Sequence, residues 1–394
     1  MTAQFGRGAA ALSLAAALST ALPVSAAEPI KIGLIHPFTG PLSPVGIEAT
    51  DGFEHYFDVH GKTVAGREIV IIKEDSAGIP AQAMERVRRL VERERVDLLT
   101  GITSSAEAYA VRDYIDGRQI PLVIMGNAGA NDITDKRGSP YIFRTSFANY
   151  QDNAPFGGYA CQKLGYKKVA VMFSDFVTGY EMSGGFESTY TRAGCEVVTR
   201  IKAPLGTSDY APFLSQVPGS GIDAVWAMFF GADAIAFVKQ YQAFGLKGKL
   251  PLIGTGSFED QTLIDAMGET AEGIMGAAGY APDLDLPQNA AFVKSFTAKH
   301  KVLPAGTTVS GYNAAEAIVR AVAAVDGKIE NKDAFLAALR KTRFDAPGGV
   351  FRFDDKQNTI HDMYLLQNVK QNGKVVPHMV EKIASDVDQF WQRN

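Results

Sequence analysis

The sequence alternates along its length between short, continuous apolar runs and stretches whose apolar residues recur at helical spacing. Residues 30–35 (IKIGLI) form the first run, and Ala49, Phe53 and Phe57 after it share one face of a helix. Because continuous apolar strands are buried on both sides, this pattern predicts an α/β fold with parallel sheets between layers of helices. Later apolar runs occupy residues 69–72, 96–102, 121–125, 168–173, 224–229 and 250–254.

The number of strands predicts two lobes, since a single parallel sheet of this width would be unusual. An extended segment at residues 141–146, before a helix expected over 149–164, marks one seam. Glycines within 273–280 mark a return seam, and residues 347–381 alternate with period two around an Asn-Gly turn, which is typical of antiparallel strands. We expect a first lobe of residues 28–146 plus 278–346 and a second lobe of residues 147–277 plus 347–394.

Residues 1–27 have the pattern of a secretory signal peptide. Arg7 precedes an apolar run at 9–24, and small residues follow, with cleavage expected near Ala26 or Ala27. The alternative is a retained membrane anchor, although the run is short for a spanning helix. The apolar run is not followed by a Cys, which argues against a lipid anchor. We therefore expect an exported, soluble mature chain.

Composition excludes several classes of partner. The formal net charge is −4, and a mildly acidic surface argues against nucleic acid and anionic membranes. The six histidines do not cluster and the sequence has no Cys/His ligand pattern, so neither a metal nor a cofactor is expected. Cys161 and Cys195 reach an oxidising compartment, where a disulfide and two free buried thiols are both open alternatives.

Two of the apolar runs lead directly into small polar residues. Thr103, Ser104 and Ser105 follow the run at 96–102, and the segment 126–131 (GNAGAN) follows the run at 121–125. A strand that stops at such residues and restarts as a helix leaves backbone N–H groups without partners, and these accept an anion. Ser104 and Glu107 also have the spacing of a capping box. The pattern predicts a protein that holds a small carboxylate without transforming it.

The sequence lacks the common catalytic fingerprints. G-x-G-x-x-G, G-x-x-x-x-G-K-[ST] and G-x-S-x-G are all absent, and residues 254–256 (GTG) lack the third glycine of a dinucleotide site. His36, Asp75 and Asp175 lie near predicted strand ends, where structural capping is common. Their spacing indicates no nucleophile–base pair, so we do not expect an enzyme.

Several landmarks, taken in order, resemble the periplasmic solute-binding proteins of the leucine/isoleucine/valine-binding type. They are residues 31–34 (KIGL), 39–41 (TGP), Gly46, 75–78 (DSAG), Gly101 with Ser104 and Ser105, 143–145 (FRT) and 272–273 (EG). This resemblance implies two Rossmann-like lobes joined by three hinge crossovers, with the ligand trapped between them on closure. It also implies a periplasmic location and the membrane permease of an ABC importer as partner. We further expect a monomer.

The resemblance also implies the candidate ligand contacts. Small polar residues belong to the first lobe, where the loop over residues 42–46 is expected to form a wall of the site. Hydroxyl and aromatic residues belong to the second lobe. The candidates are Ser43, Val45, Thr103, Ser104, Ser105, Asn127, Ala128 and Gly129 in the first lobe, Phe176, Thr178, Phe230, Ser257 and Phe258 in the second, and Tyr280 at the return seam.

The expected ligand class follows from a departure from the family pattern. Amino-acid receptors of this type place an acidic residue where this chain has Gly256, and residues 250–258 hold no carboxylate. A desolvated ammonium without a counter-charge would cost several kcal/mol, which argues against an α-amino acid. Glu259 and Asp260 lie close by, and a shifted loop would supply one of them.

Aromatic residues around the site favour a ring as the other end of the ligand. The segments 127–131 and 143–149 also resemble the branch of this family that takes up benzoate and hydroxybenzoates. We therefore expect a receptor for a small aromatic carboxylate. A receptor for a branched-chain amino acid or an amide, and a sensor domain of the same fold, are the alternatives.

Overall fold

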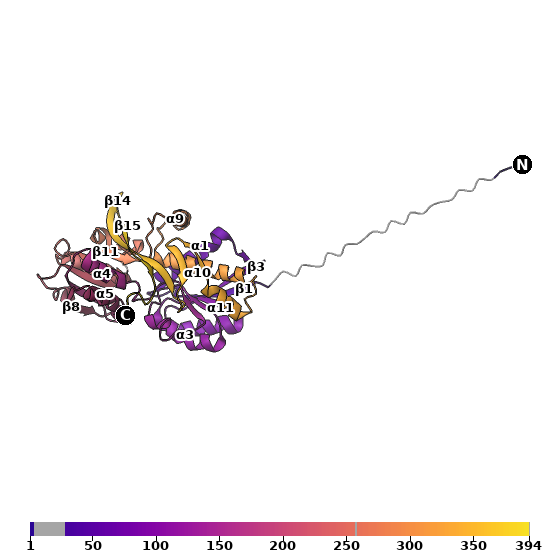
Figure 1. The fold of residues 1–394 in the computed structure, drawn as a ribbon, viewed down its shortest axis with the longest axis horizontal. Helices are drawn as coiled ribbons and strands as arrows, with labels where there is room; N and C mark the ends of the chain where they lie inside the picture. Colours follow the sequence, from indigo (N-terminus) through magenta and orange to yellow (C-terminus); the bar gives the residue numbers. More distant parts are fainter. Residues whose placement is uncertain (4–27, 257, 394) are drawn as a thin grey trace.

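The chain folds into two lobes, each built on its own sheet and lying side by side in Figure 1. The computed structural model describes residues 1–3, 28–256 and 258–393. The signal-peptide prediction therefore concerns residues that lie mainly outside the described part, and its expected cleavage site lies wholly outside it. None of the described helices combines the length and the apolar character needed to cross a membrane.

The first lobe contains a sheet of six strands in the order β2-β3-β1-β4-β5-β6, and the strands from β3 to β6 are parallel. Helices cover both faces, as predicted: α1, α10 and α11 pack on one face, and α2 and α3 on the other. The strands are β1 (Ile30–His36), β2 (Thr63–Val64), β3 (Arg67–Asp75), β4 (Leu98–Gly101), β5 (Leu122–Ile124) and β6 (Ile142–Arg144). The helices are α1 (Ser43–His60), α2 (Pro80–Arg89), η1 (Leu90–Glu94), α3 (Ser105–Arg118), η2 (Asn131–Ile133), α9 (Pro287–His300), α10 (Gly306–Ala324) and α11 (Lys332–Arg340).

The second lobe has the parallel order β8-β7-β9-β10-β11, to which β14 adds an antiparallel strand. Helices α4 and α5 cover one face, and α6, α7 and α8 cover the other. The strands of this lobe are β7 (Lys168–Ser174), β8 (Glu196–Ala203), β9 (Ala224–Phe229), β10 (Leu252–Gly256), β11 (Met275–Ala278), β14 (Thr359–Gln371) and β15 (Lys374–Val387). The strands β12 (Arg343–Ala346) and β13 (Gly349–Phe353) extend the same sheet beyond β14, but their side chains pack in the core of the first lobe. The helices are α4 (Ala154–Gln162), α5 (Val177–Arg192), α6 (Ala211–Leu214), α7 (Gly231–Ala243), α8 (Gln261–Met267) and η3 (Gly268–Ala271).

The chain passes between the lobes after β6, after β11 and before β14. The first and third passages lie side by side, because Arg144 forms a parallel bridge with Asn358. Phe351 and Phe353 pack in the core of the first lobe. The lobe boundaries stay our proposal, and this packing moves the third passage from residue 347 to the stretch after Phe353.

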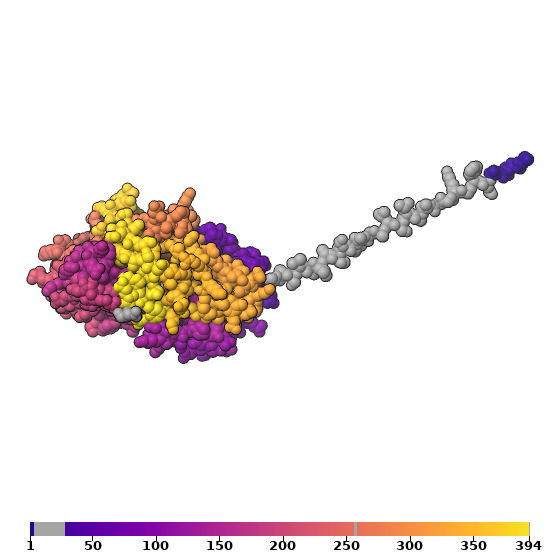
Figure 2. All heavy atoms as spheres, in the orientation of Figure 1, coloured from indigo at the N-terminus to yellow at the C-terminus, as the bar shows by residue number. Residues whose placement is uncertain are grey.

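The residues that follow β15 lie between the two lobes, where the C-terminal part of the chain crosses the middle of the molecule in Figure 2. Thr134 of the first lobe donates a hydrogen bond to Gln389 at 2.8 Å. Arg393 pairs with Asp135 of the same lobe at 2.9 Å. The terminal segment thus ties the second lobe to the first.

Three local predictions are wrong and one open alternative is decided. We expected an α-helix to begin after residues 126–131, but Asn131 begins only the three-residue 3-10 helix η2. The expected wall loop at residues 42–46 is instead the first turn of α1 from Ser43 onward. The helix expected from residue 149 begins at Ala154. Of the two alternatives for the cysteines, the structure contains the disulfide, which joins Cys161 in α4 to Cys195 just before β8.

Candidate ligand-binding site between the lobes

The carboxyl ends of the parallel strands in both sheets lie on the side where the lobes meet. The chain leaves β6 at Arg144 and β11 at Ala278 to cross to the other lobe, and both residues are the carboxyl ends of their strands. In open α/β sheets ligands bind at this edge, where loops and helix N-termini gather. The predicted contacts of the first lobe follow β1, β4 and β5 at this edge.

The start of α3 is capped, as predicted, and is also tied to the neighbouring loop. Ser104 accepts a hydrogen bond from the Glu107 backbone N–H at 3.2 Å, and the Glu107 carboxylate accepts one from the Ser104 N–H at 2.8 Å. Ser105 accepts a hydrogen bond from the Ala130 N–H at 3.0 Å. Because a hydroxyl accepts and donates at once, the Ser105 proton stays available for a ligand oxygen.

The backbone of residues 126–131, called here the 126–131 loop, is held in one orientation. The Arg144 guanidinium, fully buried, donates to the carbonyl oxygens of Ala128 and Ala130 at 3.1 and 2.9 Å. Gly129 donates its N–H to the Asn127 carbonyl at 2.7 Å, so this predicted donor is engaged within the loop. Ala128 is fully buried, yet its N–H has no hydrogen-bond partner among the described residues. The N–H of Gly126, which is also buried, shares this feature, and a buried N–H without a partner is rare.

Two buried hydroxyls, those of Thr103 and Ser146, lie two residues after the ends of β4 and β6. Within the described part of the chain, neither Thr103 Oγ1 nor Ser146 Oγ has a hydrogen-bond partner. Between them in the sheet order lies Gly126, where a Cβ atom would come within 3.0 Å of Thr103 Oγ1. Buried hydroxyls are normally satisfied, so these two keep hydrogen-bonding capacity at the sheet edge where ligands bind in such folds. Thr103 was predicted as a contact, whereas Ser146 was missed although the extended segment 141–146 had been recognised.

Three aromatic side chains pack against one apolar cluster of the second lobe, and one of them touches the 126–131 loop. Phe176 precedes α5 and Phe230 precedes α7, and both are partly buried against one apolar cluster together with Phe147. A Cβ atom at Gly129 would lie 2.8 Å from Phe147 Cε2, so this ring touches the 126–131 loop. Thr178 lies in the first turn of α5 and is partly exposed. Phe147, which lies in the first passage between the lobes, is a second residue that the sequence analysis did not select.

The remaining predicted contacts are placed less favourably. Phe258 is fully buried in the core of the second lobe, and Tyr280 is 5% exposed with its hydroxyl donating to Asn289 at 2.9 Å. Ser257 lies outside the described residues. Ser43 and Val45 are partly exposed in the first turn of α1, and Asn127 accepts a hydrogen bond from Thr307 at 3.3 Å.

Glu259 and Asp260, the two acidic residues after β10, both have other interactions than pairing with a ligand ammonium. Asp260 caps α8, accepting hydrogen bonds from the N–H groups of Thr262 and Leu263 at 2.7 and 3.3 Å. Glu259 turns towards Gly276, and burial raises its pKa to about 8. Glu48 of α1 accepts a hydrogen bond from Thr308 at 2.9 Å. Burial first, and then the negative charge of Asp260 in the other lobe, raise the pKa of Glu48 to about 8.

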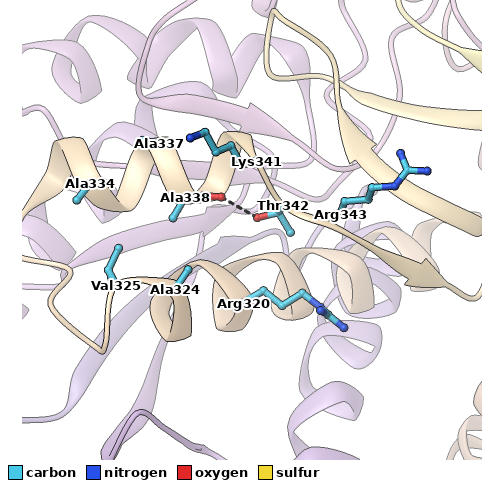
Figure 3. Close-up of a pocket in the computed structure, with 9 residues that line it drawn as sticks. All are labelled: Arg320, Ala324, Val325, Ala334, Ala337, Ala338, Lys341, Thr342 and Arg343. Carbon is cyan, nitrogen blue, oxygen red and sulfur yellow. Dashed lines mark hydrogen bonds between the residues drawn. The ribbon is translucent and has the colours of Figure 1, made fainter.

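Elsewhere the surface has a depression of about 510 Å³ between α10 and α11. Figure 3 shows small apolar side chains of the two helices facing each other there, with Arg320 and Arg343 toward one end. It contains none of the predicted ligand contacts. Among the described residues no group of three or more His, Cys, Asp or Glu side chains is arranged to hold a metal ion.

Two lobes with parallel sheets, three passages between them and polar donors at the facing strand ends define a type I periplasmic binding protein. The family model described as periplasmic binding protein matches residues 29–374, and the chain belongs to this family. It is an ABC-type substrate-binding protein of the Leu/Ile/Val-binding group, and membership implies a location outside the cytoplasm.

Individual relatives cover nearly the whole chain. The Leu/Ile/Val-binding protein homolog 6 of Brucella melitensis biotype 1 is 31% identical over 368 residues, covering 91% of this chain and 92% of the relative. An ABC transporter substrate-binding protein from Sphaerobacter thermophilus is 37% identical with a TM-score of 0.88, covering 92% and 99%. An ABC transporter solute-binding protein from R. palustris in complex with benzoate is 32% identical with a TM-score of 0.83, covering 91% and 97%.

Proposed function

We propose that this protein is the periplasmic receptor of an ABC importer and captures a small aromatic carboxylate. The observation that carries the proposal is the unpartnered N–H of buried Ala128, in the loop that Ser105 contacts and at the same sheet edge as the hydroxyls of Thr103 and Ser146. Such uncharged donors suit a carboxylate, and each hydrogen bond to a charged group contributes about 1.5–3 kcal/mol. The similar R. palustris protein in complex with benzoate supports the same ligand class.

Capture proceeds by closure of the lobes. The first lobe holds the carboxylate through Ala128 and Ser105, and the second lobe brings the rings of Phe176 and Phe230 against the ring of the ligand. Aromatic rings gain from offset and edge-on packing in addition to the area they bury. Thr178, in the first turn of α5, is the proposed partner for a ring substituent. Each lobe alone leaves one side of the ligand in water, so tight binding requires both.

The proposal extends to processing and assembly. We infer that the signal peptide is removed near Ala26 or Ala27 and that the mature chain works as a monomer. It delivers its ligand to a membrane permease and does no chemistry on it. A neighbouring gene for a permease or an ATPase supports this role, whereas a neighbouring sensor kinase favours the sensor alternative.

The ligand class is tested by calorimetric titration of the mature protein, purified under denaturing conditions and refolded to remove any bound ligand. We expect benzoate and 4-hydroxybenzoate to bind, and leucine, valine and their amides to give no heat. Ser105→Ala should weaken the binding of both acids. Binding of leucine or valine, with no response to either aromatic acid, contradicts the proposal. That outcome favours the branched-chain alternative, which the name of the Brucella relatives suggests.

A further inference from the structure

Glu181 extends from the second lobe to the 126–131 loop of the first. It lies in the second turn of α5, and its carboxylate accepts hydrogen bonds from the Asn131 N–H at 3.2 Å and from the Asn149 side-chain amide at 2.7 Å. Asn131 ends the 126–131 loop, and Asn149 lies in the first passage between the lobes. One carboxylate therefore touches the second lobe, the hinge and the loop that holds the proposed ligand donors.

Other anchors of this loop come from the first passage, where Asn149 donates its N–H to the Gly129 carbonyl at 2.7 Å and Tyr150 donates its N–H to the Asn131 side-chain oxygen at 2.9 Å, and from the first lobe. Arg144 at the end of β6 holds the Ala130 carbonyl at 2.9 Å, and Ser105 of α3 holds the Ala130 N–H at 3.0 Å. The peptide unit between Ala130 and Asn131 is thus fixed at its oxygen by Arg144 and at its N–H by Glu181. Arg144 and Ser105 move with the loop when the lobes separate, whereas Glu181 moves away from it with α5.

We propose that Glu181 is a positioning residue that couples closure of the lobes to the order of the ligand-binding 126–131 loop. The inference rests on the proposed function of this loop. With the lobes together, the bond between Glu181 and the Asn131 N–H helps to hold the loop in the orientation in which the Ala128 N–H points to the ligand. Separation of the lobes breaks the bond from the Asn131 N–H to Glu181 and loosens that end of the loop, where Tyr150 and Asp135 still hold the Asn131 side chain and carbonyl. Ligand release and loop relaxation then occur together.

A second contact between the lobes serves as the matched control. Arg393 pairs with Asp135 at 2.9 Å, so it also joins the lobes next to the hinge. Asp135 lies beyond η2, and its backbone N–H donates to the Asn131 carbonyl at 3.2 Å. Its carboxylate, which pairs with Arg393, makes no hydrogen bond to the 126–131 loop. A general effect of loosening the lobes is expected from Arg393→Gln as much as from Glu181→Ala. An effect that acts through the loop is expected from Glu181→Ala alone.

The experiment titrates benzoate into the wild type, Glu181→Ala, Glu181→Gln and Arg393→Gln, with urea unfolding of each protein. We expect Glu181→Ala to weaken binding at least tenfold and Arg393→Gln less than threefold, with similar unfolding midpoints. Glu181→Gln keeps an oxygen that accepts from the Asn131 N–H, so it should retain affinity within about threefold. Equal losses in Glu181→Ala and Arg393→Gln, or wild-type affinity in Glu181→Ala, overturn the inference.

Amide hydrogen exchange separates this inference from the proposed function. Without added ligand, Glu181→Ala should speed exchange at Asn131 at least tenfold and leave the interior of β4 unchanged, whereas Arg393→Gln should change neither. Unchanged exchange at Asn131 overturns the coupling, whatever the ligand is. Failure of the wild type to bind any aromatic acid refutes the proposed function, while faster exchange at Asn131 in Glu181→Ala still supports the positioning role.

Discussion

The polar residues at the strand edge of the first lobe fall into two groups. Ser104 and Glu107 satisfy each other in a capping box, and this pairing stabilises α3 irrespective of any ligand. Thr103 and Ser146 have no partner within the described residues, and burying an unsatisfied hydroxyl costs about 1–3 kcal/mol. Buried polar atoms without a partner also occur in the core of the second lobe, as at Tyr210 and Trp226, so it is the position of Thr103 and Ser146 at the strand edge that relates them to the proposed site.

Ser146→Ala is expected to act in opposite directions on stability and on binding. Removing a buried hydroxyl without a partner should raise the free energy of unfolding of the ligand-free protein by a few tenths of a kcal/mol to about 1 kcal/mol. The same change should weaken benzoate binding about fivefold, because one donor to the carboxylate is lost. Urea unfolding and calorimetric titration measure the two effects. A loss of stability with unchanged affinity would show that the hydroxyl is structural.

Glu259→Gln tests the buried carboxyl next to Gly276. Burial raises its pKa from 4.5 to about 8, so the folded protein holds a proton that unfolding releases between these values. Stability contributed by the protonated form is thus lost as the pH rises from about 4.5 to 8, by at most about 1.4 kcal/mol per pH unit. The neutral amide has no such dependence. Urea unfolding at pH 5, 7 and 9 should show that the free energy of unfolding of the variant rises relative to that of the wild type as the pH increases. A difference that does not change with pH would refute this.

Among the elements, α1 and α10 approach each other through glycines. A Cβ atom at Gly52 would lie 1.9 Å from the Thr308 carbonyl oxygen, and one at Gly311 would lie 2.0 Å from the Ala49 carbonyl oxygen. The two helices therefore touch backbone to backbone on one face of the first sheet. This contact also sets the start of α10, where Thr308 meets Glu48 of α1 at 2.9 Å.

Gly52→Ala and Gly311→Ala should each destabilise the protein by about 1–3 kcal/mol, because the added methyl group meets backbone that cannot rotate away. Gly184→Ala in α5 is the matched control, since a Cβ atom at Gly184 would have nothing within 4 Å. Its helical position predicts a gain of about 0.5–1 kcal/mol. Urea unfolding of the three variants checks the contrast. Similar effects at all three positions would mean that the helices do not pack as described.

The disulfide joins α4 to the start of β8 across 34 residues of sequence. Replacing Cys161 and Cys195 together by alanine releases this constraint on the unfolded chain and should cost about 2–4 kcal/mol. Benzoate affinity should be unchanged, because the bridge lies within the second lobe and contacts no residue of the 126–131 loop. Urea unfolding of the double variant and of the reduced wild type should agree. Stability equal to that of the oxidised wild type would contradict the expectation.

At the scale of the whole molecule, the sequence pattern predicted the architecture of two sheets but not the structure of the passages between the lobes. Alternation of apolar runs and helical spacing is a local signal, and so is the capping box at Ser104 and Glu107. The loss of helix after β5 has a non-local cause, because Arg144 and Glu181 hold the 126–131 loop from other elements. Ser146 and Phe147 were missed for the same reason, since only folding brings the first passage next to that loop.

Closure of the lobes is expected to depend on pH through Glu48 and Asp260, which approach from opposite lobes. Glu48, with Thr308 as its hydrogen-bond partner and Asp51 as a further nearby acid, has a pKa raised to about 8 by burial and by the charge of Asp260. Separating the lobes removes the charge of Asp260, so the pKa of Glu48 should fall from about 8 in the direction of its ordinary value of 4.5. The closed form then binds more protons than the open form between these values. Benzoate affinity should therefore decrease from pH 6 to 8 by up to tenfold per pH unit and level off above about pH 8.

Calorimetric titrations at pH 6, 7, 8 and 9 measure how benzoate affinity changes with pH. Glu48→Gln should reduce this change, because the amide carries no titrating proton. An unchanged slope in Glu48→Gln would assign the pH dependence to another group.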